Sequence, residues 1–434
     1  MKIIKITLFF LLLAGHTAWA QPGIQFKEIF TPYKSVTPAI STLQESGNLS
    51  EGLDELWNRI EKEGGPLVEP DPYDENYVQV TFIYRDASEN QTVGLELYGI
   101  YDEPRLGDLQ MQRLEGTDLF YRCYAFPKDI CFSYRVVLTD TLTGQTRKIT
   151  DPLNRNLNPT GERGRYSWSV LDLRPDEPDW YTRRYEDVGS RLETFQITSR
   201  FMENNRNIYV YLPPGYDNTR QNYSVIYLFD SFIYLNRVEV PNVLDNLIHE
   251  NRIKPMIAVF IDNPTSTSRL TELPLNPKFK AFMTDELIPE VKGRYRITDK
   301  REDTMVGGIS YGGLAAAYLA FECDSIFSKV LSQTGSFWRG LEWYDVNGID
   351  VRGDWLINRY QTADRKDLKF FLDWGLQEDW CLSSGRRMVR TLDQKGYPYR
   401  FVEFNGWHDW SNARKTFPHA LLYLMGEEEL QIKP

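Results

Sequence analysis

A serine in a glycine-flanked turn is the residue of this chain best suited to covalent chemistry. Ser310 lies in GISYG, residues 308–312, after the apolar run 304–306 and before an alanine-rich run with helical character. A G-x-S-x-G between a strand and a helix puts the serine on a sharp turn with its hydroxyl exposed. Gly308 and Gly312 leave room where strand and helix pass closely. We therefore predict that Ser310 is a nucleophile. The alternative is a tight turn in which it only caps the helix.

A serine hydroxyl is a weak nucleophile and needs a base to take its proton. Beyond residue 20 the chain contains only His249, His408 and His419. In hydrolases with this turn, the acid and then the histidine follow the serine along the chain. His249 precedes the serine in a helical run, and His419 lies in a final amphipathic run. His408 follows the last strand-like run and is our predicted base, the alternative being an exposed loop side chain.

The acid is expected where the preceding strand-like run, 368–375, comes to an end. Asp373 lies within that run and is interpreted as structural. Glu378 is the predicted acid, and Asp379 is the second choice. A carboxylate here would hold the imidazole in the required tautomer and stabilise the imidazolium that forms.

Two backbone N–H groups are needed to hold the oxyanion of an acyl-transfer reaction. One is predicted to belong to Tyr311, the residue after the nucleophile, and the other to Ser231 or Phe232 in the loop after the run 224–230. The cysteines and histidines show no metal-type spacing, so neither a metal nor a cofactor is expected.

The second half of the chain alternates apolar β-type runs with helical runs, which predicts an α/β fold with a mostly parallel sheet covered on both faces. Active sites in such folds lie at the carboxyl ends of the strands, where Ser310 is expected. The strand-like runs are 207–214, 224–230, 256–262, 304–308, 328–335, 368–375 and 399–406, and the helical runs are 239–252, 279–293, 313–323 and 384–396.

The first half has a different pattern. A helix is predicted within 46–65, and Gly64-Gly65 ends it. From Tyr77, short runs rich in β-branched and aromatic residues are separated by polar turns, which predicts an all-β sandwich. The 434 residues exceed what one core usually holds. We expect an N-terminal segment and sandwich domain at 21–173, a charged, proline-bearing linker at 174–190, and an α/β-hydrolase domain at 191–434.

The N-terminus reads as a secretory signal peptide, residues 1–20, with two lysines, an apolar run and Ala-Trp-Ala before Gln21. A transmembrane anchor is the alternative, but the apolar run is short. The expected location is therefore periplasmic or secreted, without a membrane anchor. Removing Lys2 and Lys5 takes the formal charge from -11 to -13, which argues against nucleic acid as a partner. The oligomeric state is left open.

All four cysteines follow the predicted signal peptide, in a context where disulfides persist. Cys123 and Cys131 flank a probable turn, so a bridge across a hairpin is one hypothesis. Cys323 and Cys381 could pair or remain thiols, and the sequence does not fix either pairing.

Several further motifs, together with the serine turn, resemble the enterochelin (ferric enterobactin) esterase family, in the esterase D and feruloyl-esterase-like branch of the α/β-hydrolases. The most specific is RLTELPLN, an R-x-x-E-L-P-x-N pattern at 269–276. The others are GGISYGGL at 307–314, LSQTGSFW at 331–338, GLQED at 375–379, GWHDW at 406–410, and, in the first half, 116–137 with DPLN at 151–154.

The resemblance implies the same roles for Ser310, His408 and Glu378, and it implies cleavage of the trilactone of a catecholate siderophore. A ferric tris-catecholate is anionic and flat-ringed, which suggests Arg269 and Trp338 as substrate contacts. Glu272, in the same motif as Arg269, is predicted as a third substrate-binding residue. Alternatively, Arg269 pairs with Glu272 and Trp338 is core. One departure is Ser231 where the family usually has glycine.

Two competing functions remain at this point. One is a feruloyl or acetyl esterase acting on plant polysaccharide, and the other is a non-catalytic protein that captures a siderophore. The R-x-x-E-L-P-x-N pattern disfavours the first, and the complete set of Ser310, Glu378 and His408 disfavours the second.

Overall fold

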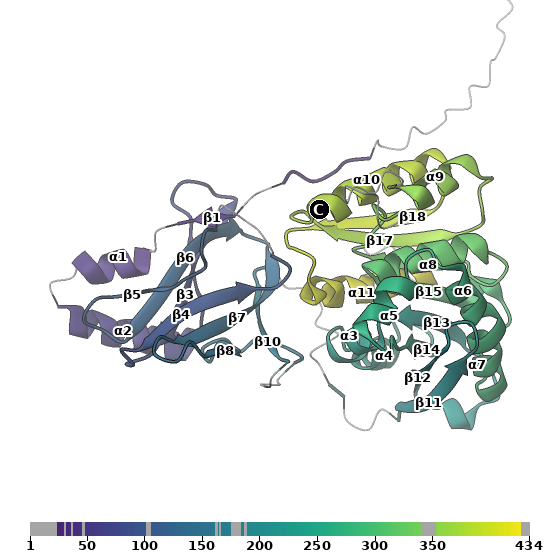
Figure 1. Ribbon diagram of the computed structural model, residues 1–434, viewed down its shortest axis with the longest axis horizontal. Coiled ribbons are helices and arrows are strands. Elements are labelled where there is room, and N and C mark those ends of the chain that lie inside the picture. The colour runs from purple at the N-terminus through teal and green to yellow at the C-terminus, as the bar shows by residue number, and fades with distance from the viewer. Residues whose placement is uncertain are drawn as a thin grey trace, which may run out of the picture.

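The computed structural model describes residues 24–426, apart from 30–31, 36–37, 46–47, 101–105, 161–163, 165, 175–183, 186–188 and 341–352. The predicted signal peptide lies outside the described residues, as does most of the predicted linker. Figure 1 shows a β-rich N-terminal part beside a larger part in which helices surround one sheet.

The N-terminal part contains two five-stranded antiparallel sheets. The first has the order β1-β6-β3-β2, with β5 also paired to β6, and the second has the order β4-β7-β10-β9, with β8 also paired to β7. The strands of the first are β1 Tyr33–Lys34, β2 Leu67–Pro70, β3 Tyr77–Arg85, β5 Gln112–Arg113 and β6 Leu119–Pro127; those of the second are β4 Gln91–Leu97, β7 Cys131–Asp140, β8 Thr146–Ile149, β9 Leu157–Asn158 and β10 Trp168–Asp172.

One hydrophobic core joins the two sheets. Phe82 of β3 and Tyr124 of β6 belong to the first sheet, and they pack in the same buried cluster as Phe132 and Tyr134 of β7 in the second. Phe82 and Tyr134 meet edge to face, with ring centroids 4.9 Å apart. Because side chains alternate across a strand, each sheet contributes every second residue to this core.

The hypothesis of a disulfide between Cys123 and Cys131 is wrong. All four cysteines are among the described residues, and all are free thiols. Cys123 lies on β6 and Cys131 begins β7, but these strands belong to different sheets. The turn between them crosses from one sheet to the other, so the two strands do not form the hairpin that the bridge requires.

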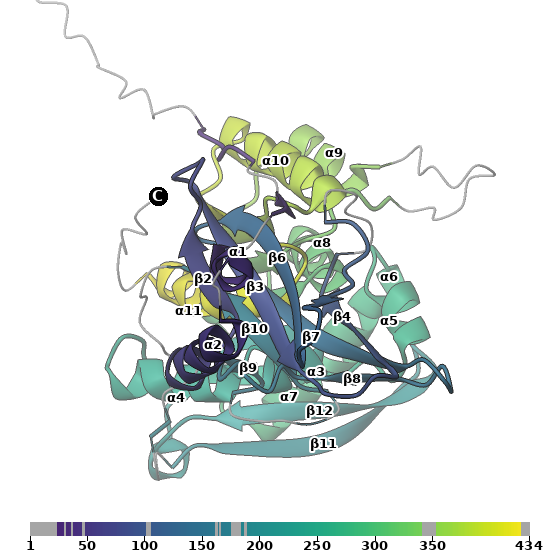
Figure 2. The same ribbon diagram turned by 90° about the vertical axis from the view of Figure 1, so that its left-hand side faces the viewer.

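The helices α1 (Pro38–Glu45) and α2 (Leu49–Glu63) lie against the outer face of the first sheet. The predicted helix within 46–65 is confirmed as α2. Its buried residues are Leu56, Trp57 and Ile60, and Gly64 ends it with a positive φ of 86°, which glycine adopts without steric cost. Figure 2 views the molecule from this N-terminal side.

The larger part is built on an eight-stranded sheet of order β11-β12-β14-β13-β15-β16-β17-β18. From β14 onwards every neighbouring pair is parallel, whereas β12 runs antiparallel to both β11 and β14. The strands are β11 Arg191–Ser199, β12 Asn204–Leu212, β13 Ser224–Phe229, β14 Met256–Ile261, β15 Thr304–Ile309, β16 Lys329–Gln333, β17 Lys369–Gly375 and β18 Tyr399–Phe404.

Helices cover both faces of this sheet, as the apolar runs predicted. Along β13, Val225 and Tyr227 enter one buried cluster with α6 to α10, while Ile226 and Leu228 enter another with α3, α4 and α11. The helices are α3 Ser231–Asn236, α4 Val240–His249, α5 Ser266–Glu272, α6 Pro277–Ala281, a π-helix Phe282–Leu287, α7 Ile288–Arg294, α8 Tyr311–Glu322, α9 Trp355–Thr362, α10 Asp379–Gln394 and α11 Trp410–Met425, with 3-10 turns at Tyr216–Asn218 and Arg301–Asp303.

The last helix, α11, lies on the side of the larger part that faces the N-terminal sheets (Figure 1) and contacts β7. Within the described ranges, none of the helices is both long enough and apolar enough to cross a membrane.

Candidate active site

The predicted strand, turn and helix around Ser310 are confirmed. β15 ends at Ile309, α8 begins at Tyr311, and Ser310 between them has φ 61° and ψ -118°. This strained backbone is typical of a serine presented at the top of a sheet. A Cβ at Gly308 would lie 2.4 Å from the carbonyl carbon of Gly312. Glycine is therefore required here by the close passage of strand and helix.

Glu378 and His408 form a hydrogen-bonded pair. His408 Nδ1 lies 2.6 Å from Glu378 Oε2, and Gly375 N–H donates to Glu378 Oε1 at 2.7 Å. The Glu378 side chain is 2% exposed, whereas that of His408 is 33% exposed. The carboxylate is thus fixed and buried, and the imidazole that it orients keeps access to a substrate. The side chain of Asp379, the second choice for the acid, lies outside the described residues.

Parallel strands bring these residues to one edge of the sheet. Ser310 follows β15, Glu378 follows β17 and His408 follows β18, all at the carboxyl ends. Within the described part of the chain, Ser310 Oγ is hydrogen-bonded to Ser336 Oγ, at 3.3 Å, and not to the imidazole. Bonds between base and nucleophile often shorten only when substrate binds. The catalytic roles of the three residues stay predictions.

The environment of His408 shifts its proton affinity upward. Burial lowers the pKa of His408, but the negative charge of Glu378 and the hydrogen bonds that the ring makes to Glu378 and Cys381 more than compensate. The pKa of His408 is therefore well above its ordinary value. An imidazole of this kind accepts a proton from a hydroxyl more readily than an isolated one would.

The predicted oxyanion donors lie at the N-termini of two helices. Tyr311 is the first residue of α8, and Ser231 is the first residue of α3, followed by Phe232. Backbone N–H groups in a first helical turn have no partner within the helix, so those of Tyr311, Ser231 and Phe232 are suited to an anion. Asp230, like Ser310, has a positive φ, in this case 62°.

Arg269 links the nucleophile turn to the loop that carries Ser231. Its guanidinium donates to both carboxylate oxygens of Asp230, at 2.6 and 2.9 Å, and to the carbonyl of Ile309 at 3.3 Å. The partner of Arg269 is therefore Asp230, and not Glu272 as one alternative proposed. Bidentate pairing of this kind fixes orientation as well as distance. Contact between Arg269 and a substrate stays a prediction.

Glu272 is directed into the protein. It forms a buried ion pair with Arg206, with Arg206 Nη2 2.8 Å from Glu272 Oε2, and accepts a second bond from Asn204. The neighbouring motif residue Asn276 caps α6 by accepting N–H bonds from the next turn. The R-x-x-E-L-P-x-N pattern thus consists largely of residues that fix the loops around the site. The predicted contact of Glu272 with substrate is not tested by this geometry.

Three aromatic side chains form a row that begins at Tyr311, the residue after Ser310. Trp338, half-buried, lies between Tyr311 and Trp380, with ring centroids 6.2 and 6.1 Å away. Trp380 is 73% exposed. Arg339 is also close to Tyr311. Burial raises the pKa of Tyr311 to about 12, and the positive charge of Arg339 partly opposes that rise. Trp338 was predicted from the sequence, but Trp380 was not, although Trp380 directly follows Glu378 and Asp379.

Asp373, interpreted as structural, is fully buried in β17. It accepts hydrogen bonds from Thr416 Oγ1 and from the N–H of Thr334, and burial raises its pKa to about 7. A carboxyl group enclosed in this way cannot reach the imidazole of His408.

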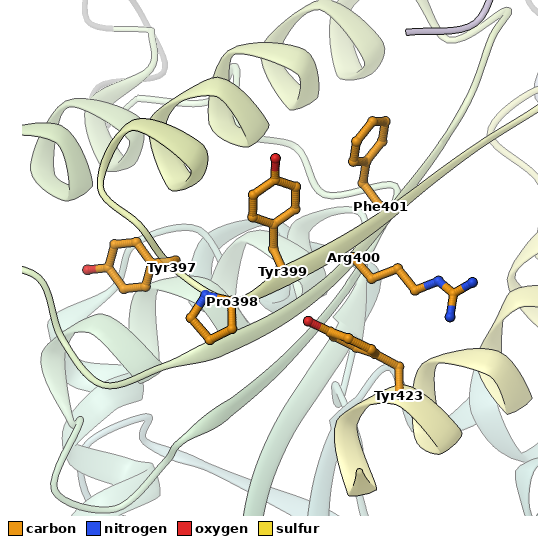
Figure 3. A pocket seen from close by; sticks show the side chains of 6 residues that line it. All are labelled: Tyr397, Pro398, Tyr399, Arg400, Phe401 and Tyr423. Carbon is orange, nitrogen blue, oxygen red and sulfur yellow. The ribbon is translucent and has the colours of Figure 1, made fainter. Parts of the chain in front are cut away.

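A pocket of about 410 Å³ lies elsewhere, at the amino end of β18. Its lining is aromatic and comes from the start of β18 and from Tyr423 of α11 (Figure 3). Because His408 follows the carboxyl end of the same strand, this pocket is at the opposite end of the sheet from the candidate site.

Two family models match the chain. The model described as "Putative esterase" matches residues 199–424, which is just over half of the chain, and "Enterochelin esterase, N-terminal" matches residues 79–180. The chain belongs to the enterochelin esterase family. It is accordingly a carboxylic-ester hydrolase, and both models fall on the sequence regions where the resemblance was seen.

Curated relatives agree with this membership. The chain is 28% identical over 324 residues to the iron(III) enterobactin esterase of Dickeya dadantii, which covers 66% of this chain and 72% of that protein. It is 24% identical over 360 residues to the enzyme of the same name from Escherichia coli K12, covering 76% and 87%.

Solved structures show the same fold. The ferric enterobactin esterase of Salmonella typhimurium superposes with a TM-score of 0.72 at 24% identity, covering 85% of this chain and 98% of that one. The enterobactin esterase of Shigella flexneri, solved in the presence of enterobactin, gives 0.69 at 23% identity, covering 84% and 96%. The α/β-hydrolase-like fold of the larger part is therefore shown.

Proposed function

We propose that this protein is an exported serine esterase that hydrolyses the trilactone of a catecholate siderophore and so releases its iron. The observation that carries the proposal is the Glu378–His408 pair at the sheet edge that also presents Ser310 on a strained turn, in a chain of the enterochelin esterase family. The name shared by its relatives, iron(III) enterobactin esterase, supports this substrate class.

The first half-reaction acylates the enzyme. Ser310 Oγ attacks a lactone carbonyl while His408 takes the hydroxyl proton, and the backbone N–H groups of Tyr311 and of Ser231 or Phe232 hold the oxyanion. When the intermediate collapses, the ester C–O bond breaks and His408 gives the proton to the departing alcohol oxygen.

The second half-reaction frees the enzyme. Water attacks the acyl group on Ser310 and gives a proton to His408, and that proton returns to Ser310 Oγ as the carboxylic acid leaves. Glu378 stabilises the imidazolium in both halves, because its buried carboxylate bonds Nδ1 directly. No proton needs to move to Glu378 for this scheme to operate.

The surroundings suit a flat, anionic substrate. Trp338 and the exposed Trp380 offer ring faces next to the nucleophile turn, and Arg269 and Arg339 supply positive charge beside Tyr311. Catechol rings can stack on tryptophan, and a ferric catecholate gains from nearby guanidinium groups. The attraction of Arg269 for an anionic substrate would be weaker than that of an unpaired arginine, because Asp230 neutralises much of its charge.

We also propose that the two N-terminal sheets form a β-sandwich domain equivalent to that of the enterochelin esterases. Support comes from the family model over residues 79–180 and from the core that the sheets share. Export rests on the signal-type sequence at residues 1–20. An esterase acting outside the cytoplasm would release iron, or smaller siderophore fragments, before inner-membrane transport.

The test is to incubate residues 21–434 and the Ser310→Ala variant with ferric enterobactin and, separately, with a feruloylated sugar, following products by mass. Linear dihydroxybenzoyl-serine fragments from the wild type alone are expected. Ferulate release with an intact trilactone would assign the protein to the polysaccharide esterases. Tight siderophore binding without product from either protein would make it a capture protein.

A further inference from the structure

The segment that carries His408 is enclosed by the N-terminal sheets. Trp407, the preceding residue, is 4% exposed and belongs to the core that those two sheets share. Its ring meets Phe132 edge to face at 5.5 Å and Phe126 at 6.5 Å. A residue of the α/β part is therefore packed inside the hydrophobic core of the other part.

Polar contacts hold the same segment from the other side of His408. Asp409 is fully buried and accepts bonds from the N–H and the hydroxyl of Ser133. Cys131 N–H donates to the carbonyl of Asn405 at 3.1 Å, and Asn412 Nδ2 donates to the carbonyl of Cys131 at 3.1 Å. The first residues of β7 thus bind the chain both before and after the histidine.

A turn of the second sheet touches His408 itself. Gly99 follows β4, and its φ is 76°. A Cβ added there would lie 3.0 Å from the carbonyl oxygen of His408 and 3.3 Å from its backbone C and N. The preceding residue, Tyr98, donates its N–H to the carbonyl of Ser133 at 2.8 Å. This turn is therefore anchored to the strand that binds Asp409.

We propose that the N-terminal sheets position the catalytic base, with Trp407, Asp409 and Gly99 as the positioning residues. The backbone at Asp409 is extended, and successive side chains of an extended chain point to opposite sides. Trp407 and Asp409 accordingly enter the N-terminal part, while His408 between them points to Glu378. This inference rests on the proposed function, because it takes His408 as the catalytic base.

The test is the substitution Gly99→Ala, with Gly144→Ala as its matched control. Gly144 also lies in a turn of the N-terminal part with positive φ, 69°, but a Cβ there meets nothing within 4 Å. The two variants therefore carry similar backbone strain, and only Gly99→Ala presses on His408. Ser133→Ala removes the hydroxyl hydrogen bond from Ser133 to Asp409 and keeps the backbone one. It is a milder second variant that keeps the test possible if Gly99→Ala does not fold.

The kinetic readout is hydrolysis of an activated phenyl ester and of ferric enterobactin. A displacement of 1 Å in a catalytic group can cost about 100-fold in rate, so a shift of a few tenths of an ångström should lower kcat about tenfold. KM should stay within about twofold, because no substrate contact is changed. Gly144→Ala should match the wild type in both. Equal kcat for the two glycine variants would overturn the proposal.

A second readout does not depend on activity. Residues 21–434 contain three histidines, so their ring proton signals can be resolved by NMR and that of His408 assigned with a His408→Gln variant. Gly99→Ala should shift the His408 signal, and Gly144→Ala should not. If the wild type hydrolyses neither ester, the proposed function fails. The NMR signal of His408 still tests whether the N-terminal sheets position this side chain, and an unmoved signal in Gly99→Ala refutes that proposal.

Discussion

Replacing Glu272 by glutamine should destabilise the protein strongly, although the side chain keeps its size. Arg206 and Glu272 have side chains 0% and 5% exposed, and they are joined at 2.8 Å. Glu272→Gln would leave the guanidinium buried without its counter-charge. Arginine does not lose its proton in proteins, so the cost cannot be avoided by neutralisation.

The expected loss follows from the burial of this pair. Removing one partner of a buried ion pair costs about 3–5 kcal/mol. In a folding unit of this size, each kcal/mol lowers Tm by about 2–4 °C, which gives a decrease of roughly 6–20 °C. Urea unfolding followed by tryptophan fluorescence, together with calorimetry, measures both quantities.

A matched control is Glu290→Gln in the exposed pair Glu290–Arg294, whose side chains are 43% and 47% exposed. An exposed pair of this kind contributes less than about 1 kcal/mol. The double variant Arg206→Met with Glu272→Leu should recover most of the lost stability, because apolar replacements of buried ion pairs are often neutral. A Glu272→Gln variant of unchanged Tm but raised KM would refute this reasoning and favour the predicted substrate contact.

The remaining predictions concern the candidate site. Ser310→Ala should lower kcat by several orders of magnitude with little change in siderophore binding, and unchanged turnover would rule out this nucleophile. With His408 as the predicted base, only its neutral form can take the proton of Ser310, so its raised pKa should make kcat/KM rise with pH through that pKa. Glu378→Gln should move this rise to lower pH and reduce kcat by about three to four orders of magnitude, as a pH–rate profile would show. Potential metal-ligand atoms of Glu378, Cys381 and His408 lie within 4.8 Å of one another, and Zn²⁺ accepts ligands of these types. Zn²⁺ should therefore inhibit the wild type, and Cys381→Ser should weaken that inhibition. Equal inhibition of both proteins would contradict this prediction.

The features that could be predicted from the sequence are those encoded locally. The Ser310 turn depends on glycines two residues to either side, and the close contact of Gly308 with Gly312 confirms the steric reason for them. The sheet strands read as apolar runs because both faces are covered. β11 was missed because most of its residues are at least partly exposed, so it lacks such a run.

The contacts that could not be predicted are those between distant segments. The partner of Arg269 is Asp230, 39 residues away. The sequence does not show which of two carboxylates, Asp230 or the nearby Glu272, pairs with this arginine. A turn between two strands does not reveal whether they pair or belong to different sheets, which is why the hairpin around Cys123 and Cys131 was expected wrongly. Likewise, the sequence around Trp407 does not indicate that its ring enters the core of the two N-terminal sheets.

The place of Trp407 in that core has a consequence for the order of folding. The two N-terminal sheets are synthesised first, but one aromatic ring of their core comes from Trp407, which follows their last strand, β10, by more than 230 residues. Domains usually fold as units as they emerge, whereas here the unit made first stays incompletely packed until Trp407 has been synthesised. A chain shortened before residue 405 should therefore expose apolar surface on the N-terminal sheets as well as lose His408, its predicted base.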